Sequence, residues 1–518
     1  MIRTIAEREF FSNVFGYKFA VAMALCLILL PLGTYVSTRS YELRLERYAR
    51  DRDAHEKDLT NLHVYSALQP KVDRRPPVLS ILSEGLEERV TGIVRADPHR
   101  VPCLKGKGGV AMDRNRYTDA FPSLDPVWLL AFILSLVALL FAHDTIAGDR
   151  ELGTLRLTLS NPVPRHQILL GKYLGGIASL FIPALSGFIA ALIVMDLSSA
   201  VSLSRADWIA ISLIFFFSLT YLSAFFLLGM TGSALTKKRS TCLILLLSVW
   251  VTLTQLLPNV SVLVAKNVIP ITSMEKVSAE RKALDDQKNQ KISEIWQVGG
   301  QAMGGRWRVL VSKRDSNGQG SLFRFMSPET AEVLRTLFRD IENVEIRHAD
   351  QIARLDRSFV RQLERQQGLA DLLAGPSLAG PFSSVVCALA GTDVEAFKTF
   401  VEDARQYRLG VLSFLNERET LDSYRLFTDD SMEDIQTDWP RALEAGTRSQ
   451  AELAEQKNAA DSDPKRLLDL SGMPRFSQKK EGVSKKLSRT GRAVGILLVS
   501  NIVLFLLAFL FFLRYDPR

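Results

Sequence analysis

The feature that most constrains this sequence is a set of six long apolar runs. About 20 helical residues cross the hydrocarbon core of a bilayer, where every backbone polar group must be bonded within the protein. Each run therefore predicts a membrane-spanning helix. The first run is too long for the apolar centre of a signal peptide and no small-residue cleavage site follows it, so we expect it to be retained. The runs cover residues 19–36, 126–143, 168–195, 208–235, 242–265 and 493–513.

The distribution of basic residues predicts that both ends of the chain are cytoplasmic. Basic residues precede the first run and lie in residues 144–167 and 236–241, whereas the short loop at 196–207 carries only Arg205. Cytoplasmic loops are enriched in lysine and arginine. A basic cluster at 479–492, before the last run, opposes this orientation, and the sequence leaves that conflict open. The net charge of +8 thus has a membrane explanation, and no nucleic-acid-binding motif accompanies it.

The two long polar stretches, residues 37–125 and 266–492, are predicted to be mainly helical extracytoplasmic insertions. In the second, apolar residues at helical spacing predict helices over 278–298, 327–373 and 393–417. Residues 307–311 and 322–326 favour a β-hairpin across Ser316-Asn317-Gly318, and 447–480 is expected to be a linker or a loosely packed tail. Residues 1–18 are expected to form a cytoplasmic interfacial helix, and 514–518 a cytoplasmic tail.

The four cysteines are too few for a disulfide scaffold and have no metal-binding spacing. Cys26 and Cys242 fall in or beside apolar runs, where a small apolar residue is the expected role. Cys103 and Cys387 both lie in predicted extracytoplasmic segments, where an oxidising compartment permits a bridge. The sequence leaves open whether they pair.

No catalytic or metal-binding motif is present in the sequence, so no enzyme activity, metal or cofactor is predicted for this chain. Residues 148–154 imitate the glycine spacing of a phosphate-binding loop but lack its lysine and the strand before it. The apolar runs contain no ionisable group away from their ends, which an ion-coupled carrier would need. Energy for transport would therefore have to come from another chain.

The loop between the second and third runs, residues 144–167, is the best candidate for receiving that energy. Leu152, Leu155 and Leu159 would share one face of a short helix, with Glu151 and Arg156 beside them, and Pro162 would end it. An apolar stripe with a charged rim fits a groove in a partner protein. The alternative is a helix that lies in the lipid interface.

This loop resembles that of the permease subunits of type-two ATP-binding-cassette exporters, in the NosY-like and GldF-like subgroup with a large extracytoplasmic insert. The resemblance continues at Asp125-Pro126, at 380–382, at 389–393, at Tyr407-Arg408 and at 473–476, so it covers nearly the whole chain at low density. Asp149 departs from the more usual glutamate but keeps its charge. The residues that carry the resemblance in the loop are Asp144, Asp149–Glu151, Gly153–Leu155, Leu159, Ser160, Pro162, Arg165 and Ile168–Lys172.

In that family the loop is a coupling helix that docks on a cytoplasmic ATPase subunit, which binds ATP and Mg²⁺. The resemblance implies that ATPase as a partner, a second permease subunit that is identical or related, and the bacterial inner membrane as location. The large insert suggests a periplasmic or outer-membrane partner. The implied coupling residues are Asp149, Arg150, Glu151, Gly153, Thr154, Leu155, Arg156, Leu159 and Arg165.

The competing interpretation is a non-transport membrane scaffold or sensor, whose outer domain binds a ligand or a protein while the spans anchor it. Six spans exceed what anchoring needs. Neither the transported substrate, nor the residues that bind it, nor the choice between homodimer and heterodimer follows from the sequence.

Overall fold

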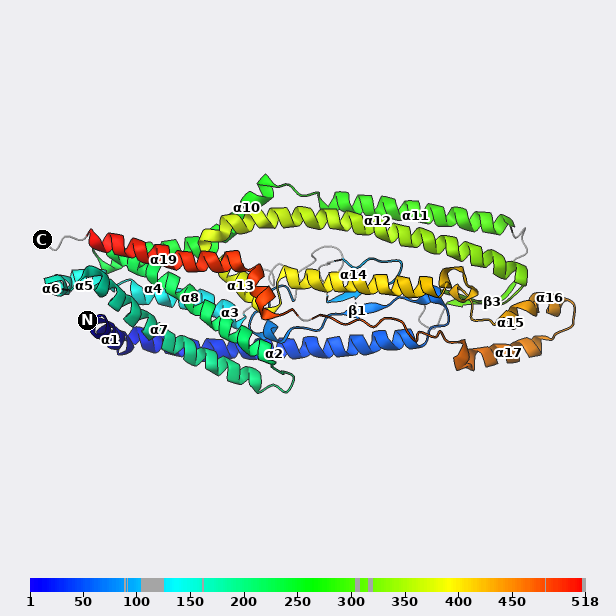
Figure 1. The fold of residues 1–518 in the computed structure, drawn as a ribbon, viewed down its shortest axis with the longest axis horizontal. Coiled ribbons are helices and arrows are strands. Elements are labelled where there is room, and N and C mark those ends of the chain that lie inside the picture. Colours follow the sequence, from blue (N-terminus) through cyan, green and yellow to red (C-terminus); the bar gives the residue numbers. More distant parts are fainter. Residues whose placement is uncertain are drawn as a thin grey trace.

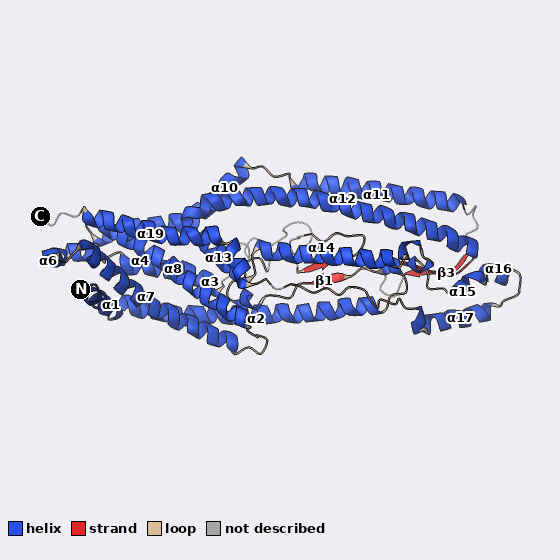
Figure 2. Ribbon diagram, in the orientation of Figure 1, coloured by secondary structure: helices blue, strands red, loops and turns tan. Residues whose placement is uncertain are grey.

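The computed structural model describes residues 1–87, 90, 92–103, 125–160, 163–302, 308–314, 320–479 and 481–514. The described part is mostly helical, with two small pairs of strands (Figure 2). Six helical stretches of this described part are long and apolar enough to cross a membrane, which confirms the predicted all-α polytopic fold. They are α2 (Tyr17–Thr60), α3 to α5 (Pro126–Glu151), α7 (Arg165–Asp196), α8 (Arg205–Leu235), α9 to α10 (Arg239–Val268) and α19 (Gly491–Leu513).

Two of these stretches contain a π-helical turn. The second consists of α3 (Pro126–Leu129), a π turn (Leu130–Leu134), α4 (Ser135–Ala142) and, after a short break, α5 (Ala147–Glu151). The fifth consists of α9 (Arg239–Val251), a π turn (Thr252–Leu256) and α10 (Leu257–Val268). Residues in and beside these turns connect the two stretches: the indole N–H of Trp250 donates to Ser135 Oγ at 2.9 Å, and the Trp250 ring lies 4.8 Å from that of Phe132.

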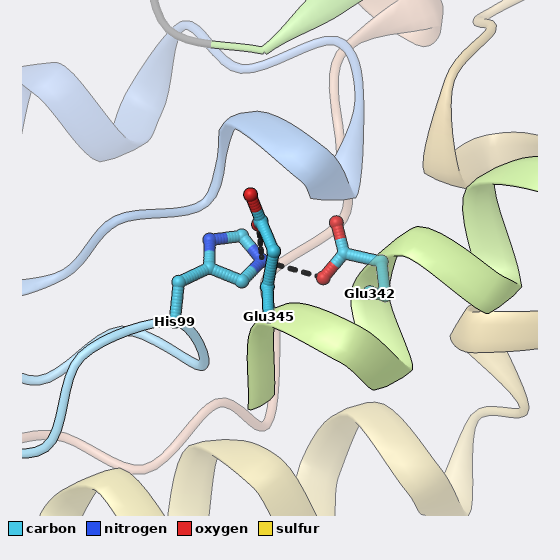
Figure 3. Close-up of side chains that lie close together, drawn as sticks. All are labelled: His99, Glu342 and Glu345. Atoms are coloured by element: carbon cyan, nitrogen blue, oxygen red, sulfur yellow. Dashed lines mark hydrogen bonds and ion pairs between the residues drawn. The ribbon is translucent and has the colours of Figure 1, made fainter. Parts of the chain in front are cut away.

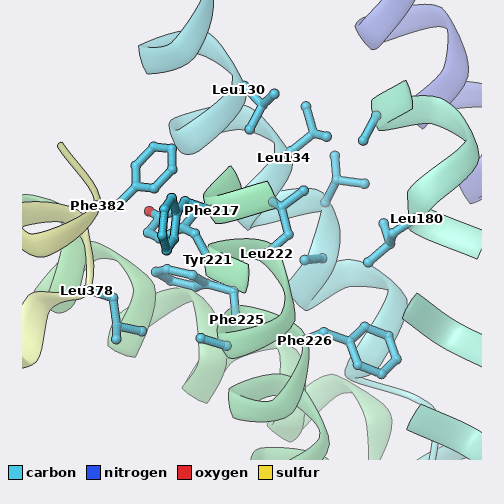
Figure 4. Packing of buried hydrophobic residues seen from close by; sticks show 14 of the residues in the cluster. Leu130, Leu134, Leu180, Phe217, Tyr221, Leu222, Phe225, Phe226, Leu378 and Phe382 are labelled. Carbon is cyan, nitrogen blue, oxygen red and sulfur yellow. The ribbon is translucent and has the colours of Figure 1, made fainter. Parts of the chain in front are cut away.

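Helix α8 lies at the centre of the bundle, in contact with α4, α7, α9 and α19. Four aromatic residues of α8, Phe217, Tyr221, Phe225 and Phe226, are buried (Figure 4). On the other side of α7, α2 packs along its length, and so does α1 (Ile2–Val14) near the amino terminus. A Cβ at Gly175 of α7 would lie 2.4 Å from the Ala6 carbonyl oxygen of α1, so only glycine permits this approach.

Both termini lie at one end of the elongated molecule, and the long polar segments reach toward the other end (Figure 1). We call the part beyond the bundle the distal region. It contains the end of α2, residues 61–103 and most of residues 269–490. Helix α2 runs without a break from the bundle to Thr60, so the expected boundary at residue 37 falls inside a helix of 44 residues.

The distal region is built on a long antiparallel pair of helices, α11 (Met274–Ala302) and α12 (Pro328–Ala374). The strands β3 (Val309–Arg314) and β4 (Ser321–Met326) pair antiparallel with Val311 opposite Arg324, as the hairpin prediction required; Trp307 and the turn residues 316–318 lie outside the described residues. In the first insertion, β1 (Lys71–Asp73) pairs with β2 (Ile93–Arg95). Short 3₁₀ helices cover Tyr65–Ala67, Val78–Ile81, Gly375–Ser377, Thr420–Asp422, Tyr424–Leu426 and Pro464–Arg466.

Helix α13 (Ala379–Ala390) belongs to the second insertion but packs into the bundle, against α8 and α19. The Phe382 ring stacks on that of Tyr221, with 4.6 Å between their centroids (Figure 4). Gly391 ends α13, and the Asp393 carboxylate caps α14 (Val394–Glu417) by accepting the Ala396 N–H at 3.2 Å. The expected helix at 393–417 is therefore present. The predicted extracytoplasmic domain at 266–492 also supplies part of the bundle core.

The prediction of a linker over 447–480 is wrong in its first half. Residues Gln450–Ser462 form α17, which starts with a capping box between Ser449 and Glu452. The remaining helices of this part are α15 (Met432–Gln436), α16 (Trp439–Glu444) and α18 (Val483–Arg489). Helix α17 was not expected because most of its residues are polar and it buries only Ala460.

A buried ion pair joins the segments of the distal region. The Arg324 guanidinium of β4 binds both carboxylate oxygens of Asp429, and neither side chain is exposed. His63 follows α2 in the chain, and its Nδ1 lies 2.9 Å from the same carboxylate. Burial disfavours the charged carboxylate, but the bonds from His63 and Arg324 outweigh it and hold the pKa of Asp429 at about 2.

Cys103 and Cys387 are not bridged, so the pairing considered from the sequence is not formed. Cys387 lies in the last turn of α13, which precedes α14, and carries a free thiol whose Sγ is 3.6 Å from Ser83 Oγ. Pro102, beside Cys103, accepts a hydrogen bond from Arg405, which lies about three turns or roughly 17 Å further along α14. A disulfide needs Cα atoms within about 7 Å of each other.

Candidate functional site

The loop between the second and third spans forms two short helices, α5 (Ala147–Glu151) and α6 (Thr154–Ser160), rather than the single helix expected. They lie at the same end of the molecule as both termini (Figure 1). Gly153 separates them with a φ of +75°, a conformation that other residues rarely adopt. The sequence contained the glycine, but its positive φ only becomes visible in the structure.

The break at Gly153 changes which leucines face outward, so the predicted stripe of Leu152, Leu155 and Leu159 is wrong. Leu155 is fully buried, and Leu159 packs against the bundle core. Leu152 and Leu157 instead project from the protein, with exposed fractions of 69% and 70%. We call the exposed residues Glu151, Leu152, Gly153 and Leu157 the exposed tip. Arg156 lies in α6, but its side chain is outside the described part.

Behind the exposed tip, Asp149 faces inward to a buried lysine. Lys172 of α7 is only 6% exposed, and its Nζ lies 2.7 Å from Asp149 Oδ2 and 3.1 Å from Glu9 Oε2 of α1. The Thr154 hydroxyl donates to Asp149 Oδ1 at 3.1 Å and to the Asp149 carbonyl at 3.3 Å. Burial raises the pKa of Glu9, although Lys172 acts in the opposite direction. Asp149 and Thr154 therefore join α5 to α1 and α7.

The Lys172 cluster was missed in the sequence, although a signal was present. A lysine five residues into an apolar run is rare and usually has a specific partner. Its partners, Glu9 and Asp149, are 163 and 23 residues away, so only the fold brings them together.

The end of α8 and the start of α9 hold α5 from another side. The Arg150 guanidinium donates to the carbonyls of Thr236 at 2.8 Å and Ala234 at 3.2 Å. Ser233 Oγ accepts hydrogen bonds from the backbone N–H groups of Ile146 and Ala147 at 3.0 and 2.8 Å. These N–H groups lie at the start of α5, where a helix offers them no partner of its own. Arg150 thus serves the attachment of α5 and does not project to a partner.

Glu151 is half exposed and contacts the start of α9. Its carboxylate accepts the backbone N–H of Arg239 at 3.2 Å and lies 3.7 Å from Arg239 Nε. The Arg239 guanidinium also donates to the Gly148 carbonyl at 3.2 Å.

Two further contacts tie the loop to the remaining helices. Lys18 of α2 binds Asp144 at 2.6 Å, and Arg165 at the start of α7 donates to the Leu513 carbonyl at 2.7 Å, at the end of α19. The predicted coupling residues therefore fall into two groups. Asp149, Arg150, Thr154, Leu155, Leu159 and Arg165 attach the helix pair to the bundle, whereas Glu151 and Gly153 belong to the exposed tip.

The sequence profile of the ABC-2 family transporter proteins matches residues 4–296, more than half of the chain and the whole of the site. The chain belongs to this family. Residues 342–476 match a second profile, a domain of unknown function (DUF3526).

Two similar proteins are each described as a probable ABC transporter permease protein NosY. The one from Stutzerimonas stutzeri is 44% identical over 81 residues, which are 15% of this chain and 29% of the relative. The one from Pseudomonas aeruginosa is 48% identical over 60 residues, which are 12% of this chain and 22% of the relative. The chain thus matches less than a third of the length of each relative. As an ABC-2 protein, it is a multi-pass membrane subunit of an ABC transporter.

Proposed function

We propose that this chain is the permease subunit of an ABC exporter and that a separate cytoplasmic ATPase docks on the exposed tip. The observation that carries the proposal is the contrast within one short helix pair. Two leucines project outward at about 70% exposure, while the residues behind them are fixed to the bundle by buried ionic and hydrogen-bonded contacts. A surface that transmits the movement of a docked partner needs exposed apolar side chains for binding and a firm attachment to the helices that must move.

The exposed tip has the chemistry of a docking element. Leu152 and Leu157 offer apolar surface, and Glu151 beside them supplies a charged rim. Such surfaces fit grooves in partner proteins, where buried apolar anchors carry most of the binding energy. The family implies an ATPase partner, and the exposed tip is the surface that we assign to it.

The contacts behind the exposed tip define how its movement would spread. A displacement of α5 would pull on Lys172 of α7, on Glu9 of α1 and on the carbonyl end of α8 through Arg150. Packed helices respond to a displacement of this kind by moving as rigid bodies. We therefore infer that ATP-driven closure of the ATPases moves α1, α7 and α8 together and opens a path for a substrate.

The same arrangement supports cytoplasmic termini in an inner membrane. The termini and the exposed tip share one end, so the distal region would lie outside, where it would also meet any periplasmic partner (Figure 1). The opposing basic cluster before α19 has local partners: Arg489 binds Asp393 at 2.9 Å and Glu481 at 2.8 Å, and Lys486 donates to the Leu389 carbonyl at 3.1 Å. Folding of the distal region therefore accounts for these charges.

A second permease subunit would complete the exporter. Helices α9, α10 and α19 expose many aliphatic side chains that lipid or a second subunit would cover. We assign the pairing surface to this side of the bundle, and the same design serves a homodimer or a heterodimer.

The proposal is tested by Leu157→Glu in the intact transporter, with Leu197→Glu as the matched control. Leu197 is 80% exposed but lies in the loop between α7 and α8, at the opposite end of these spans. Charging a buried apolar anchor costs about 2–4 kcal/mol, or roughly 30- to 1,000-fold in affinity. We expect Leu157→Glu to lose the co-purifying ATPase, and Leu197→Glu to retain it.

An intact Leu157→Glu complex with normal ATP-driven transport would contradict the proposal and place α6 in the lipid interface. If no ATPase accompanies the wild-type protein, the scaffold or sensor interpretation replaces the exporter.

A further inference from the structure

A histidine and two glutamates meet where the first insertion contacts the second (Figure 3). His99 follows β2 in the first insertion, and Glu342 and Glu345 lie on α12. His99 Nε2 is 2.5 Å from Glu342 Oε2 and 3.2 Å from Glu345 Oε2. Neither the transport function nor the exposed tip uses these residues.

The donor atoms converge as the ligands of a metal ion do. Glu342 and Glu345 are three residues apart on a helix, which places both carboxylates on one face, and His99 approaches that face from another segment. One donor atom of each residue lies within 4.8 Å of the others. Ligand atoms about 2.0–2.2 Å from a tetrahedral Zn²⁺ are roughly 3.3–3.6 Å apart, so small side-chain movements suffice to admit an ion.

The surroundings supply a second, independent reason to expect a cation. Asp97, two residues before His99, is 1% exposed, and its two carboxylate oxygens accept no hydrogen bond of ordinary geometry from the described residues. The nearby Arg408 directs its Nε and Nη2 to the carbonyls of Asp97 and Pro98, at 3.1 and 2.7 Å. Glu342 is also buried, at 4% exposure. Buried carboxylates normally need a paired charge or a metal ion.

We propose that His99, Glu342 and Glu345 bind one divalent transition-metal ion of the Zn²⁺ type, with Asp97 as the adjacent buried carboxylate. The ion would join the segment after β2 to α12 and so fix the two insertions to each other. The proposal does not depend on the exposed tip or on the ATPase.

The ligand types select among metals. One imidazole nitrogen with carboxylate oxygens suits Zn²⁺ and neighbouring first-row ions. Ca²⁺ and Mg²⁺ prefer shells made of oxygen, and Cu⁺ prefers sulfur. Zn²⁺ is therefore the probe, and Mg²⁺ is the comparison ion.

The rival explanation is a purely ionic cluster, in which a protonated His99 lies between the two glutamates. Burial lowers the pKa of His99, but the carboxylates of Glu342 and Glu345 have the larger, opposite effect and raise the pKa to about 9. A proton could then balance the carboxylates without a metal, and the experiment must separate these two cases.

The test is equilibrium binding of Zn²⁺ to the purified full-length protein after treatment with a chelator, using the wild type, Glu345→Gln and Asp285→Asn. Asp285 is the matched control because its carboxylate lies 3.0 Å from His348 Nε2 on the α11–α12 pair, and among the described residues this pair belongs to no group of three ligands. We expect one Zn²⁺ per wild-type chain and unchanged binding in Asp285→Asn. Glu345→Gln should weaken binding at least 10-fold, because it removes a ligand but keeps a hydrogen-bonding group.

Zn²⁺ should also raise the thermal midpoint of the wild type, and Mg²⁺ at the same concentration should not. Absence of stoichiometric Zn²⁺ binding in the wild type would overturn the proposal and leave the ionic cluster. Equal affinity in the wild type and Glu345→Gln would overturn it as well. Gel filtration and circular dichroism check the fold of the variant, and if it misfolds, the wild-type stoichiometry alone decides.

Discussion

Replacing Lys172 with methionine should detach α1 from α7. Lys172 is 6% exposed, and its ammonium lies 2.7 Å from Asp149 and 3.1 Å from Glu9. Charges 4 Å apart attract by about 4 kcal/mol at an effective dielectric constant near 20, but burying the lysine offsets much of that gain. Removing the lysine leaves two facing carboxylates without their cation, which typically costs about 3–5 kcal/mol.

Amide hydrogen exchange in α1 measures that cost directly, because local opening exposes the amides of this helix. A loss of about 3–5 kcal/mol corresponds to roughly 150- to 5,000-fold faster exchange, or to complete loss of protection. Lys172→Met combined with Glu9→Gln should recover part of the protection, since only one carboxylate then remains charged.

Arg3→Met is the control within the same helix. Arg3 pairs with Glu7 at 2.7 Å, but its side chain is 90% exposed, so its removal should leave the exchange of α1 unchanged. The reasoning is refuted if Lys172→Met changes α1 exchange by less than about two-fold, because the buried triad would then contribute nothing to docking α1.

Other predictions concern the distal region and its attachment. Burial raises the pKa of Asp430 to about 6, so near pH 5 the folded state holds a proton that the unfolded chain releases. The free energy of unfolding should therefore increase by about 1 kcal/mol as the pH falls from 7 to 5. Asp430→Asn should flatten the profile of thermal midpoint against pH, whereas an unchanged slope would assign the increase to another group. Phe382→Ala removes a buried ring that stacks on Tyr221 and should cost about 3–5 kcal/mol, seen as faster proteolysis around α13; wild-type resistance would show that α13 is held elsewhere. A non-reducing peptide map should recover Cys103 and Cys387 unlinked, and a linked pair would contradict the separation of these residues.

The sequence predicted features that depend on local pattern and length. Six apolar runs were long enough to span a bilayer, and six helical stretches of the described residues have the length and apolar composition of spans. The helical spacing at 327–373 and 393–417 became α12 and α14, and the alternation at 322–326 became β4. Each of these signals lies within the segment that it describes.

The features that failed depend on backbone angles or on distant partners. The positive φ of Gly153 turns Leu155 inward and Leu157 outward, which no periodicity in the loop reveals. Whether Cys103 meets Cys387 depends on how far along α14 the segment before Cys103 lies, and here Pro102 contacts Arg405 in the middle of that helix. Helix α17 is different: the spacing of Ser449 and Glu452 is that of a capping box, which is a local signal, but the prediction for 447–480 considered only its polar composition and poor periodicity.

Site-specific photo-crosslinking in native membranes identifies the surface that the ATPase contacts. A photo-reactive residue is placed at Leu157 on the exposed tip and, in a second variant, at Leu197 in the loop between α7 and α8. We expect an adduct with an ABC-type ATPase from position 157 and none from position 197. An ATPase adduct from 197 alone, or lipid adducts alone from 157 in a complex that still contains the ATPase, would contradict this expectation.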